Sequence, residues 1–426
     1  MSKLIRSWVE SANSHETPFP LNNLPYGVFS TKDLDARCGV AIGDLILDVS
    51  TLEAKGLIKA TTFPLCQEAR WNSLMEAGSQ VWSKFRMRLV ELLIEGGETS
   101  LSANRHLREQ VLIDADKARL HLPLKVAEYT DFYSGKHHAT NVGTLLRGPE
   151  NPLPPNWLHL PIGYNGRSSS VVVSGTDVQR PWGQLKSPEF DTPIFTPSRR
   201  FDIELEMGAI VGTASSGPIT VAEADDNIFG YVLLNDWSAR DIQAWEYHPL
   251  GPFQAKATAT SISPWIVTKA ALEPFRTSTP EREKDLLPHL VEPKPLLYNV
   301  ALEVELKPEG SVATTLSATN MDQLYFSSAQ QLAHHTTSGC PMSVGDLLGT
   351  GTISGPTKNE RGSLLELSWG GKEPIDLGNG ISRTFVEDGD TLTLRGNALG
   401  EGYRIGFGDC AGKVVAAASD PYKRKS

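Results

Sequence analysis

Cysteine is scarce in this sequence, and its few residues are not grouped. The four cysteines are Cys38, Cys66, Cys340 and Cys410, with no Cys-x-x-Cys pair and no short-spaced cluster with histidine. This pattern argues against a structural zinc site and against a disulfide scaffold. We interpret the four thiols as reduced and structural.

Long apolar runs and an excess of basic charge are also absent. No stretch approaches the ~20 apolar residues of a membrane span, and the polar start Met1–Arg6 lacks the apolar core of a secretory signal. The formal net charge of -10 gives no basic footprint for nucleic acid. We therefore expect a cytoplasmic protein that binds neither nucleic acid nor membranes. If its substrate is an anion, local Arg and Lys side chains must overcome the background charge.

A chain of 426 residues exceeds what one hydrophobic core usually fills, so two domains are expected. We predict a small domain over residues 1–118, with a hairpin around a Gly43-Asp44 turn. Its predicted helix carries apolar residues at helical spacing: Trp82, Phe85, Leu89 and Leu92.

Residues 119–426 are predicted to form the second domain. They contain short apolar runs separated by glycine and aspartate, including 345–355, 364–369 and 390–394, which favour antiparallel strands. The fold class that this predicts is mostly β.

The most acidic of these expected strands is residues 200–208, Arg-Phe-Asp-Ile-Glu-Leu-Glu-Met-Gly. Its apolar residues alternate with Asp202, Glu204 and Glu206, so one face resembles core and the other concentrates carboxylates. Like charges on one face repel unless a cation compensates, and Glu204 with Glu206 could reach one Mg²⁺ or Ca²⁺. A solvated acidic face is an equally good interpretation. Residues 300–306 show the same alternation without a partner motif nearby, and we interpret them as a solvated face.

A buried strand that ends on Asn235-Asp236 precedes an expected helix. The ends of strands hold side chains rigidly at an opening. Within the helix, Arg240, Gln243 and Tyr247 lie on one face, which is polar and suits a pocket better than a core.

Two further residues are ambiguous from the pattern alone. His137 and His138 are adjacent in a polar stretch and could be metal ligands, a general base with its neighbour, or surface residues, and the polar context favours the surface. Glu366, between Leu365 and Leu367, is typical of an ordinary strand glutamate.

The order of the motifs is more informative than any one of them. Along the chain stand Asp131-Phe132-Tyr133 with His138, Glu204-Leu205-Glu206, Asn235 to Asp241, Lys256 with Thr260, Gly351 to Gly355, and Gly402 to Gly408. Together, over nearly the whole chain, they resemble the fumarylacetoacetate hydrolase family. The resemblance implies a small SH3-like N-terminal barrel followed by a mixed β-sandwich roll of that family's type, working as a homodimer.

The resemblance also implies an activity. It is hydrolysis of the carbon-carbon bond of 4-fumarylacetoacetate to fumarate and acetoacetate, the last step of tyrosine and phenylalanine catabolism. Such a reaction needs a base, a stabiliser for the oxyanion and an electrophile for the enolate. By resemblance, His138 is the base and Glu366 holds its imidazole in the useful tautomer. The implied donors of the oxyanion site are Arg240, Gln243 and Lys256.

Metal and substrate contacts follow from the same resemblance. The implied neighbourhood of Mg²⁺ and/or Ca²⁺ consists of Asp131, Glu204, Glu206, Asp236, Lys256 and Thr260. The implied contacts of a dicarboxylate substrate are Tyr133, Arg147, Gln243, Tyr247 and Thr352. Arg147 is the natural partner for a terminal carboxylate, because its guanidinium binds two oxygens at once.

The chain departs from the family pattern at Thr258-Ala259, where the family commonly has an aromatic residue and a glycine; that glycine matters if the loop needs a positive φ. The nearest rival function is an acylpyruvate or dioxo-acid hydrolase of the same family, but such proteins usually lack a long N-terminal domain. A non-catalytic calcium-binding module is a second rival. It would need the carboxylates but not His138, Glu366, Arg240 and Lys256 together.

Overall fold

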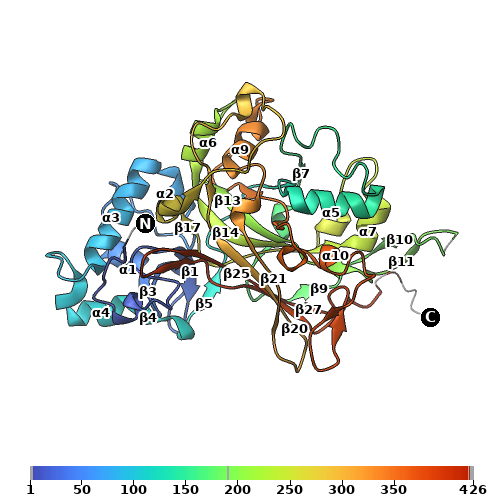
Figure 1. Ribbon diagram of the computed structural model, residues 1–426. Helices are drawn as coiled ribbons and strands as arrows, with labels where there is room; N and C mark the ends of the chain where they lie inside the picture. The colour runs from blue at the N-terminus through green and yellow to red at the C-terminus, as the bar shows by residue number, and fades with distance from the viewer. Residues whose placement is uncertain (1–2, 190, 421, 423–426) are drawn as a thin grey trace.

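The structure is a computed structural model that describes residues 3–189, 191–420 and 422. Its N-terminal part, blue in Figure 1, is a five-stranded antiparallel sheet in the order β4-β3-β2-β1-β5 with helices beside it. The strands are β1 Tyr26–Ser30, β2 Arg37–Ile42, β3 Leu45–Asp48, β4 Leu112–Asp114 and β5 Arg119–His121. The helices are α1 Val49–Ala54, α2 Asn72–Glu76, α3 Ser79–Leu93 and α4 Arg105–Val111.

Both predictions for this part are confirmed. Strands β2 and β3 pair across the Gly43-Asp44 turn, and α3 buries Phe85, Leu89 and Leu92. Strand β5 pairs with β1, so the N-terminal sheet includes residues after 118. The division of the chain at residue 118 stays a prediction.

The rest of the chain is built on two larger sheets. An eight-stranded mixed sheet has the order β7-β6-β22-β13-β14-β16-β8, with β17 also paired to β14. Its strands are β6 Tyr129–Phe132, β7 Gly163–Asn165, β8 Val171–Val173, β13 Leu205–Val211, β14 Ile228–Asp236, β16 Thr260–Ile262, β17 Val267–Thr268 and β22 Leu347–Gly349.

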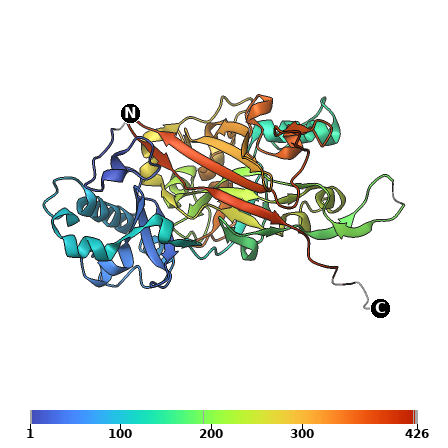
Figure 2. The ribbon, with the colours of Figure 1, turned by 90° about the horizontal axis from the view of Figure 1, so that it is seen from below.

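The six-stranded sheet has the order β21-β20-β25-β27-β9, with β26 paired to β25, and its long strands cross the view in Figure 2. Its strands are β9 Val178–Gln179, β20 Ala301–Lys307, β21 Thr314–Asn320, β25 Thr391–Leu399, β26 Arg404–Gly406 and β27 Cys410–Val415. Four short pairs complete the strands: β10 Trp182–Leu185 with β11 Ile194–Pro197, β12 Phe201–Asp202 with β15 Ser238–Ala239, β18 Arg276–Thr277 with β19 Leu297–Tyr298, and β23 Ile375–Asp376 with β24 Ser382–Arg383. The prediction of a mostly β fold is confirmed.

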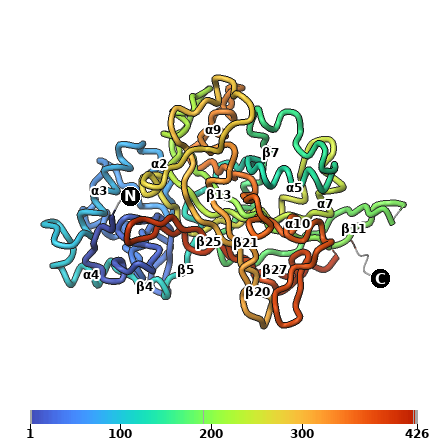
Figure 3. Tube along the Cα trace, viewed as in Figure 1, coloured from blue at the N-terminus to red at the C-terminus, as the bar shows by residue number. Residues whose placement is uncertain are grey.

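Helices cover the larger sheets, and α6 and α9 lie together in Figure 1. They are α5 Lys136–Arg147, α6 Val221–Asn227, α7 Arg240–Glu246, α8 Lys269–Leu272, α9 Ser328–Thr336 and α10 Leu364–Leu367. In the tube of Figure 3, the red segment near β25 reaches the blue N-terminal part. There the backbone N–H of Gly406 donates to the carbonyl of Pro18 at 2.8 Å.

Strand β14 lies at the centre of the molecule and is buried along its whole length. Tyr231 and Leu233 belong to the core shared with the six-stranded sheet. Val232 and Leu234 belong to the core shared with the N-terminal part. A strand covered on both faces needs apolar side chains at successive positions, which explains its continuous apolar run. The carboxyl end of β14, at Asp236, is therefore held rigidly beside the candidate site.

Two of the predicted strands are corrected by the structure. Residues 364–369 do not form a strand: Leu364–Leu367 is the short helix α10. The side chain of Ser363 caps it by accepting from the N–H of Glu366 at 3.3 Å, and burial of Leu364 and Leu367 produces the apolar pattern that suggested a strand. In 345–355 only Leu347–Gly349 is a strand, and the turn at Gly351, with φ of 78°, ends it. Among the described residues, no helix has the length and apolar character needed to cross a membrane.

Candidate active site

Four carboxylates from strands β6, β13 and β14 of the eight-stranded sheet, or from the residues beside them, meet at one point. Asp131 lies on β6, Glu204 and Glu206 lie before and on β13, and Asp236 ends β14. One oxygen of each lies within 4.8 Å of the others, and all four side chains are buried. The intervening strand β22 presents Gly349, where a Cβ would lie 2.5 Å from Oδ1 of Asp131. A glycine at this position therefore leaves room for the carboxylates. Because all three acids of residues 200–208 are buried, a solvated acidic face is excluded.

Burial and mutual repulsion act on the pKa values of these acids. Burial, followed by the charge of Asp131, raises the pKa of Glu206 well above its usual value. Burial and neighbouring acids likewise raise the pKa of Asp131, and burial raises that of Asp236 despite the nearby Lys256. Glu204 is the exception: burial alone would raise its pKa, but the charges of Arg240 and Lys256 hold it well below its usual value.

The residues present fit a divalent cation. Oδ1 of Asp131, Oε1 of Glu206 and Oδ1 of Asp236 are buried and have no hydrogen-bond partner among the residues that the structure describes. Buried oxygens without partners are costly unless something compensates them. Carboxylate oxygens are hard ligands of the kind that Mg²⁺ and Ca²⁺ prefer.

His138 faces this cluster from the first turn of α5. Its Nδ1 lies 2.7 Å from Oε2 of Glu366, and its Nε2 lies 3.6 Å from Oε1 of Glu204. Burial would raise the pKa of Glu366, but the His138 charge and surrounding donors hold it low. An ionised Glu366 only accepts hydrogen bonds, so Nδ1 of His138 is the nitrogen that donates to it. In the neutral imidazole this tautomer leaves the lone pair on Nε2, the nitrogen that faces Glu204.

Three further side chains with N–H donors, those of Arg240, Gln243 and Lys256, lie next to the acids. Arg240 begins α7, and its Nη1 lies 2.8 Å from Oε1 of Glu204 while its buried Nη2 has no partner. Oε1 of Gln243 accepts from Nη1 of Arg240 at 3.2 Å, which leaves the amide N–H groups of Gln243 free to donate. The ammonium of Lys256 pairs with Glu204 and, at 2.7 Å, with Asp236. Burial would lower the pKa of Lys256, but these acids raise it, so the lysine is charged.

Most of these groups line one cavity of about 710 Å³. Of the predicted residues, the structure brings the following to its wall: Asp131, Tyr133, His138, Glu204, Arg240, Gln243, Tyr247, Lys256 and Thr352. Glu366, Glu206 and Asp236 do not line the cavity, but Glu366 contacts His138, and Glu206 and Asp236 contact the other two acids of the cluster. Thr260 is opposite Asp236 in the β14–β16 pair, with a buried hydroxyl. Arg147 is not brought to the wall: it is exposed at the end of α5 and donates to the carbonyl of Pro152.

Some residues of the site were not anticipated from the sequence. The hydroxyl of Tyr164 lies within hydrogen-bond distance of two of the acids, 2.8 Å from Oδ2 of Asp236 and 3.1 Å from Oδ2 of Asp131. It lies in a glycine- and serine-rich segment whose pattern indicated only turns. Arg200 also lines the cavity. Asn141, one turn after His138 on the same helix, donates to Oε1 of Glu366 at 2.8 Å, and this i, i+3 spacing is the one signal that could have pointed to it.

The departure at Thr258-Ala259 requires no glycine. Neither residue is among those with positive φ. Ala259 is buried, and the Thr258 hydroxyl donates to the carbonyl of Gln179 at 3.2 Å. The loop that connects Lys256 to Thr260 is therefore compatible with these side chains.

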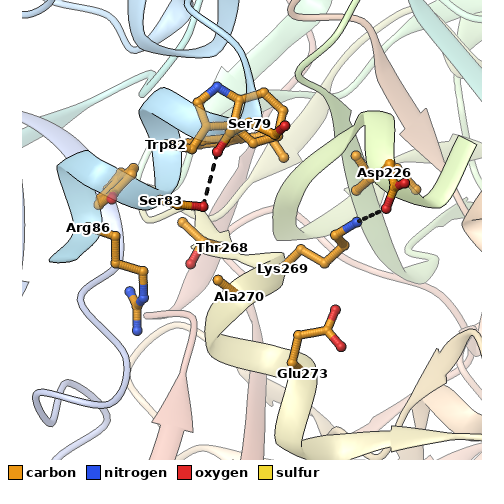
Figure 4. A pocket seen from close by; sticks show the side chains of 12 residues that line it. Ser79, Trp82, Ser83, Arg86, Asp226, Thr268, Lys269, Ala270 and Glu273 are labelled. Carbon is orange, nitrogen blue, oxygen red and sulfur yellow. Dashed lines mark hydrogen bonds and ion pairs between the residues drawn. The ribbon is translucent and has the colours of Figure 1, made fainter. Parts of the chain in front are cut away.

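A second cavity, of about 380 Å³, lies between α3 and the segment around α8 (Figure 4). The charged groups within it are already paired. Arg86 donates to the carbonyls of Asn22 and Asn23 at 2.6 and 2.7 Å, and Lys269 lies beside Asp226. This contrasts with the unpartnered oxygens of the larger cavity.

Comparisons with known proteins agree with this geometry. A family model described as fumarylacetoacetate (FAA) hydrolase C-terminal matches residues 128–415, and one described as fumarylacetoacetase N-terminal matches residues 22–123. The chain is 47% identical to a fumarylacetoacetase of Dictyostelium discoideum over 425 residues, covering 97% of this chain and 99% of that one. It is also 47% identical to the fumarylacetoacetase of Homo sapiens over 410 residues, covering 95% and 98%. Among solved structures, a fumarylacetoacetate hydrolase from Exiguobacterium antarcticum shares the fold, with a TM-score of 0.53 and 17% identity over 92% of this chain and 99% of that one.

Proposed function

The chain belongs to the fumarylacetoacetate hydrolase family, and from that membership we propose that it hydrolyses 4-fumarylacetoacetate to fumarate and acetoacetate in tyrosine and phenylalanine breakdown. The observation that carries this proposal is that the His138–Glu366 pair lies beside a cluster of four buried carboxylates, and that His138, Asp131 and Glu204 line the same cavity. A base next to a set of metal ligands is what metal-assisted hydrolysis of a diketone requires.

His138 is the proposed base. Its free Nε2 takes a proton from water while the resulting hydroxide adds to the fumaroyl carbonyl carbon. Glu366 keeps the proton on Nδ1 and stabilises the imidazolium that forms. Proton transfer of this kind typically contributes about 10²- to 10⁴-fold to the rate.

The addition places negative charge on the former carbonyl oxygen. The proposed donors to this oxygen are Nη2 of Arg240, which has no partner among the described residues, the amide N–H groups of Gln243 and the third N–H of Lys256. When the carbon-carbon bond breaks, its electron pair leaves as the enolate of acetoacetate, which takes up one proton. Removing one such donor typically costs about 3 kcal/mol of transition-state stabilisation.

A divalent cation is the proposed cofactor, held by Asp131, Glu204, Glu206 and Asp236 with Lys256 and Thr260 beside them. Bound there, it supplies a Lewis acid for the diketone oxygens and the departing enolate. We propose Mg²⁺ or Ca²⁺, because all four ligands are carboxylates. The positive charge of Lys256 and Arg240 offsets only part of the charge of the four acids.

Substrate contacts are proposed at Tyr133, Gln243, Tyr247 and Thr352, which line the cavity. Arg147 remains a proposed partner for the distal carboxylate. Its guanidinium would have to leave the carbonyl of Pro152 to reach the substrate.

The test is a comparison of substrates. Purified protein is assayed with 4-fumarylacetoacetate and with short acylpyruvates, and the proposal predicts a higher kcat/KM for the first. A preference for short acylpyruvates would favour the related dioxo-acid hydrolases instead. A His138→Ala variant that binds metal without turnover separates an enzyme from a metal-binding module, and full activity in this variant would contradict the assignment of the base.

We also propose a cytoplasmic homodimer. Supporting the dimer, large apolar side chains next to the cavity mouth are exposed: Trp245, Tyr247, Leu250 and Phe253, with Leu250 at 94%. Exposed apolar patches of this kind commonly mark protein interfaces. Sedimentation equilibrium gives the mass of the particle, and a monomer at micromolar concentration would contradict the dimer.

A further inference from the structure

Asp202 is a fully buried carboxylate that the proposed chemistry does not use. It has no exposed surface and is not among the residues that line the cavity. Although it belongs to the same acidic alternation as Glu204 and Glu206, it is absent from the group of metal-ligating acids. Its role must therefore be exerted through its neighbours.

The carboxylate of Asp202 accepts four hydrogen bonds. Oδ1 accepts from the backbone N–H of Ile203 and of Leu364, each at 2.8 Å. Oδ2 accepts from the backbone N–H of Leu365 at 3.0 Å and from Nε of Arg240 at 2.8 Å. Both oxygens are thus occupied, and the side chain has one position.

One pair of these bonds fixes the helix that carries Glu366. Leu364 and Leu365 are the first two residues of α10, and Glu366 follows them directly. A helix of one turn has little stability of its own, because its first N–H groups have no partner within the helix. The Asp202 carboxylate satisfies two of them. The position of Glu366, and with it the orientation of the His138 imidazole, depends on this contact.

The remaining bond fixes Arg240, which lines the same cavity as His138. With Nε held by Asp202, the planar guanidinium of Arg240 has a single orientation, in which Nη1 reaches Glu204 and Nη2 remains unpartnered. The buried carboxylate of Asp202 therefore contacts both the helix that carries Glu366 and the side chain of Arg240, a proposed donor to the oxyanion.

We propose that Asp202 is a positioning residue for hydrolysis, setting the geometry of the His138–Glu366 pair and of Arg240 together. The inference rests on the proposed function. A misplacement of about 1 Å at reacting groups can cost about 10²-fold in rate. Loss of Asp202 should therefore lower kcat far more than it changes KM.

A matched control exists in the N-terminal part. Asp48 is also buried, caps the start of α1 by accepting from the N–H of Thr51 at 2.8 Å, and pairs with Arg37 at 3.4 Å. It performs the same structural tasks, helix capping and an arginine contact, away from the cavity. Asp48→Asn therefore measures what loss of such a carboxylate costs in stability alone.

The experiment compares Asp202→Asn with Asp48→Asn in kcat, KM and Tm, with divalent metal at saturation. The inference predicts that Asp202→Asn lowers kcat by about 10²-fold with little change in KM, while Asp48→Asn keeps the kcat of the wild type. Asp202→Ser, which is smaller and cannot overpack the site, is the second variant if Asp202→Asn does not fold. In combination with Glu366→Gln, Asp202→Asn should cost less than it does alone, because both act on the same base. A kcat close to that of the wild type in a folded variant, or additive losses in the double variant, would overturn the inference.

A second readout does not require turnover. The Nδ1 proton of His138, bound to Glu366, should give a downfield imidazole resonance in the proton NMR spectrum, assigned by its loss in His138→Gln. Asp202→Asn should shift or broaden this resonance, and Asp48→Asn should leave it in place. If the wild type does not turn over 4-fumarylacetoacetate, the proposed function fails, and this spectrum still decides the positioning. An unchanged resonance in Asp202→Asn would contradict it.

Discussion

Nδ1 of His138 lies 2.7 Å from Oε2 of Glu366, although the two residues are 228 positions apart in the chain. Three more donors hold the same carboxylate: Asn141, Ser354 and Ser363, at 2.8 to 3.0 Å. A buried acid with this many donors is ionised and has one orientation. The carboxylate of Glu366 is therefore positioned to accept a hydrogen bond from the His138 imidazole rather than to react with substrate.

The first prediction concerns this contact. Glu366→Gln keeps the shape of the side chain but removes the charge that stabilises the imidazolium, so kcat should fall by about 10²-fold or more. Steady-state kinetics with the folded variant measures this loss. The adjacent His137 is the control, because it does not line the cavity: His137→Asn should retain most of the activity. If His137→Asn were inactive and Glu366→Gln active, the wrong imidazole would have been assigned.

The second prediction concerns the acidic cluster. Glu206→Gln removes one of the buried ligands, so calorimetric titration with Ca²⁺ or Mg²⁺ should show a loss of at least about tenfold in affinity. Glu303 on β20 is a matched control, because it stands in the same kind of alternation but on a partly exposed face. Glu303→Gln should bind metal as the wild type does. Equal metal affinity in the wild type, Glu206→Gln and Glu303→Gln would contradict the carboxylate site.

The comparison of these two strands shows what the sequence can predict. Residues 200–208 and 300–306 have the same alternation, and in both the apolar face is core, as predicted. Whether the acidic side chains are buried or exposed depends on which other segments pack over them. Residues 300–306 keep a partly exposed face, as predicted, and Glu305 pairs there with Arg395 at 2.6 Å. In 200–208 the face is covered by segments distant in the sequence, which the pattern of one strand does not contain.

The same limit explains Glu366 and Tyr164. A run of Leu-Leu-Glu-Leu is compatible with a strand, and the helix forms because Ser363 and the distant Asp202 cap it. Tyr164 became part of the site through the pairing of β7 with β6, which places it opposite Asp131. Contacts between residues so far apart in the sequence are set by the tertiary fold. The main residues of the candidate site were therefore predicted from the family motifs and not from local sequence patterns.

The third prediction concerns stability away from the site. Asp225 on α6 is buried and contacts Arg276 at 2.9 Å and Lys294 at 3.0 Å. Burial alone would raise its pKa, but Lys269, Lys294 and Arg276 together hold it below the usual value. A pKa lowered by folding means that the ionised form stabilises the native state. This contribution is complete at pH 7 and is lost as the pH falls below about 4.

Asp225→Asn should therefore lower the free energy of unfolding by about 3 kcal/mol at pH 7. The difference from the wild type should shrink toward pH 3. Urea unfolding at the two pH values measures it. The neighbouring Asp226 is the control, since its side chain is 79% exposed, and Asp226→Asn should change stability little. A difference for Asp225→Asn that stayed constant with pH would contradict the role of its charge.

The fourth prediction concerns the hydroxyl of Tyr164, which connects Asp131 and Asp236. Tyr164→Phe removes a donor that orients two proposed ligands, and such losses typically cost about 10- to 100-fold in metal affinity or activity. The metal concentration that gives half-maximal activity should rise. Because phenylalanine fills the same space, the variant should still fold, and an unchanged metal requirement would exclude this role.

The most direct test is turnover of 4-fumarylacetoacetate by the purified protein before chelation, after removal of divalent ions with EDTA, and after addition of Mg²⁺ or Ca²⁺. The proposed function predicts turnover in the untreated protein, its loss on chelation, and its recovery with metal. Turnover that persists unchanged in a verified metal-free protein would contradict the metal site, and no turnover with any metal would contradict the assigned reaction.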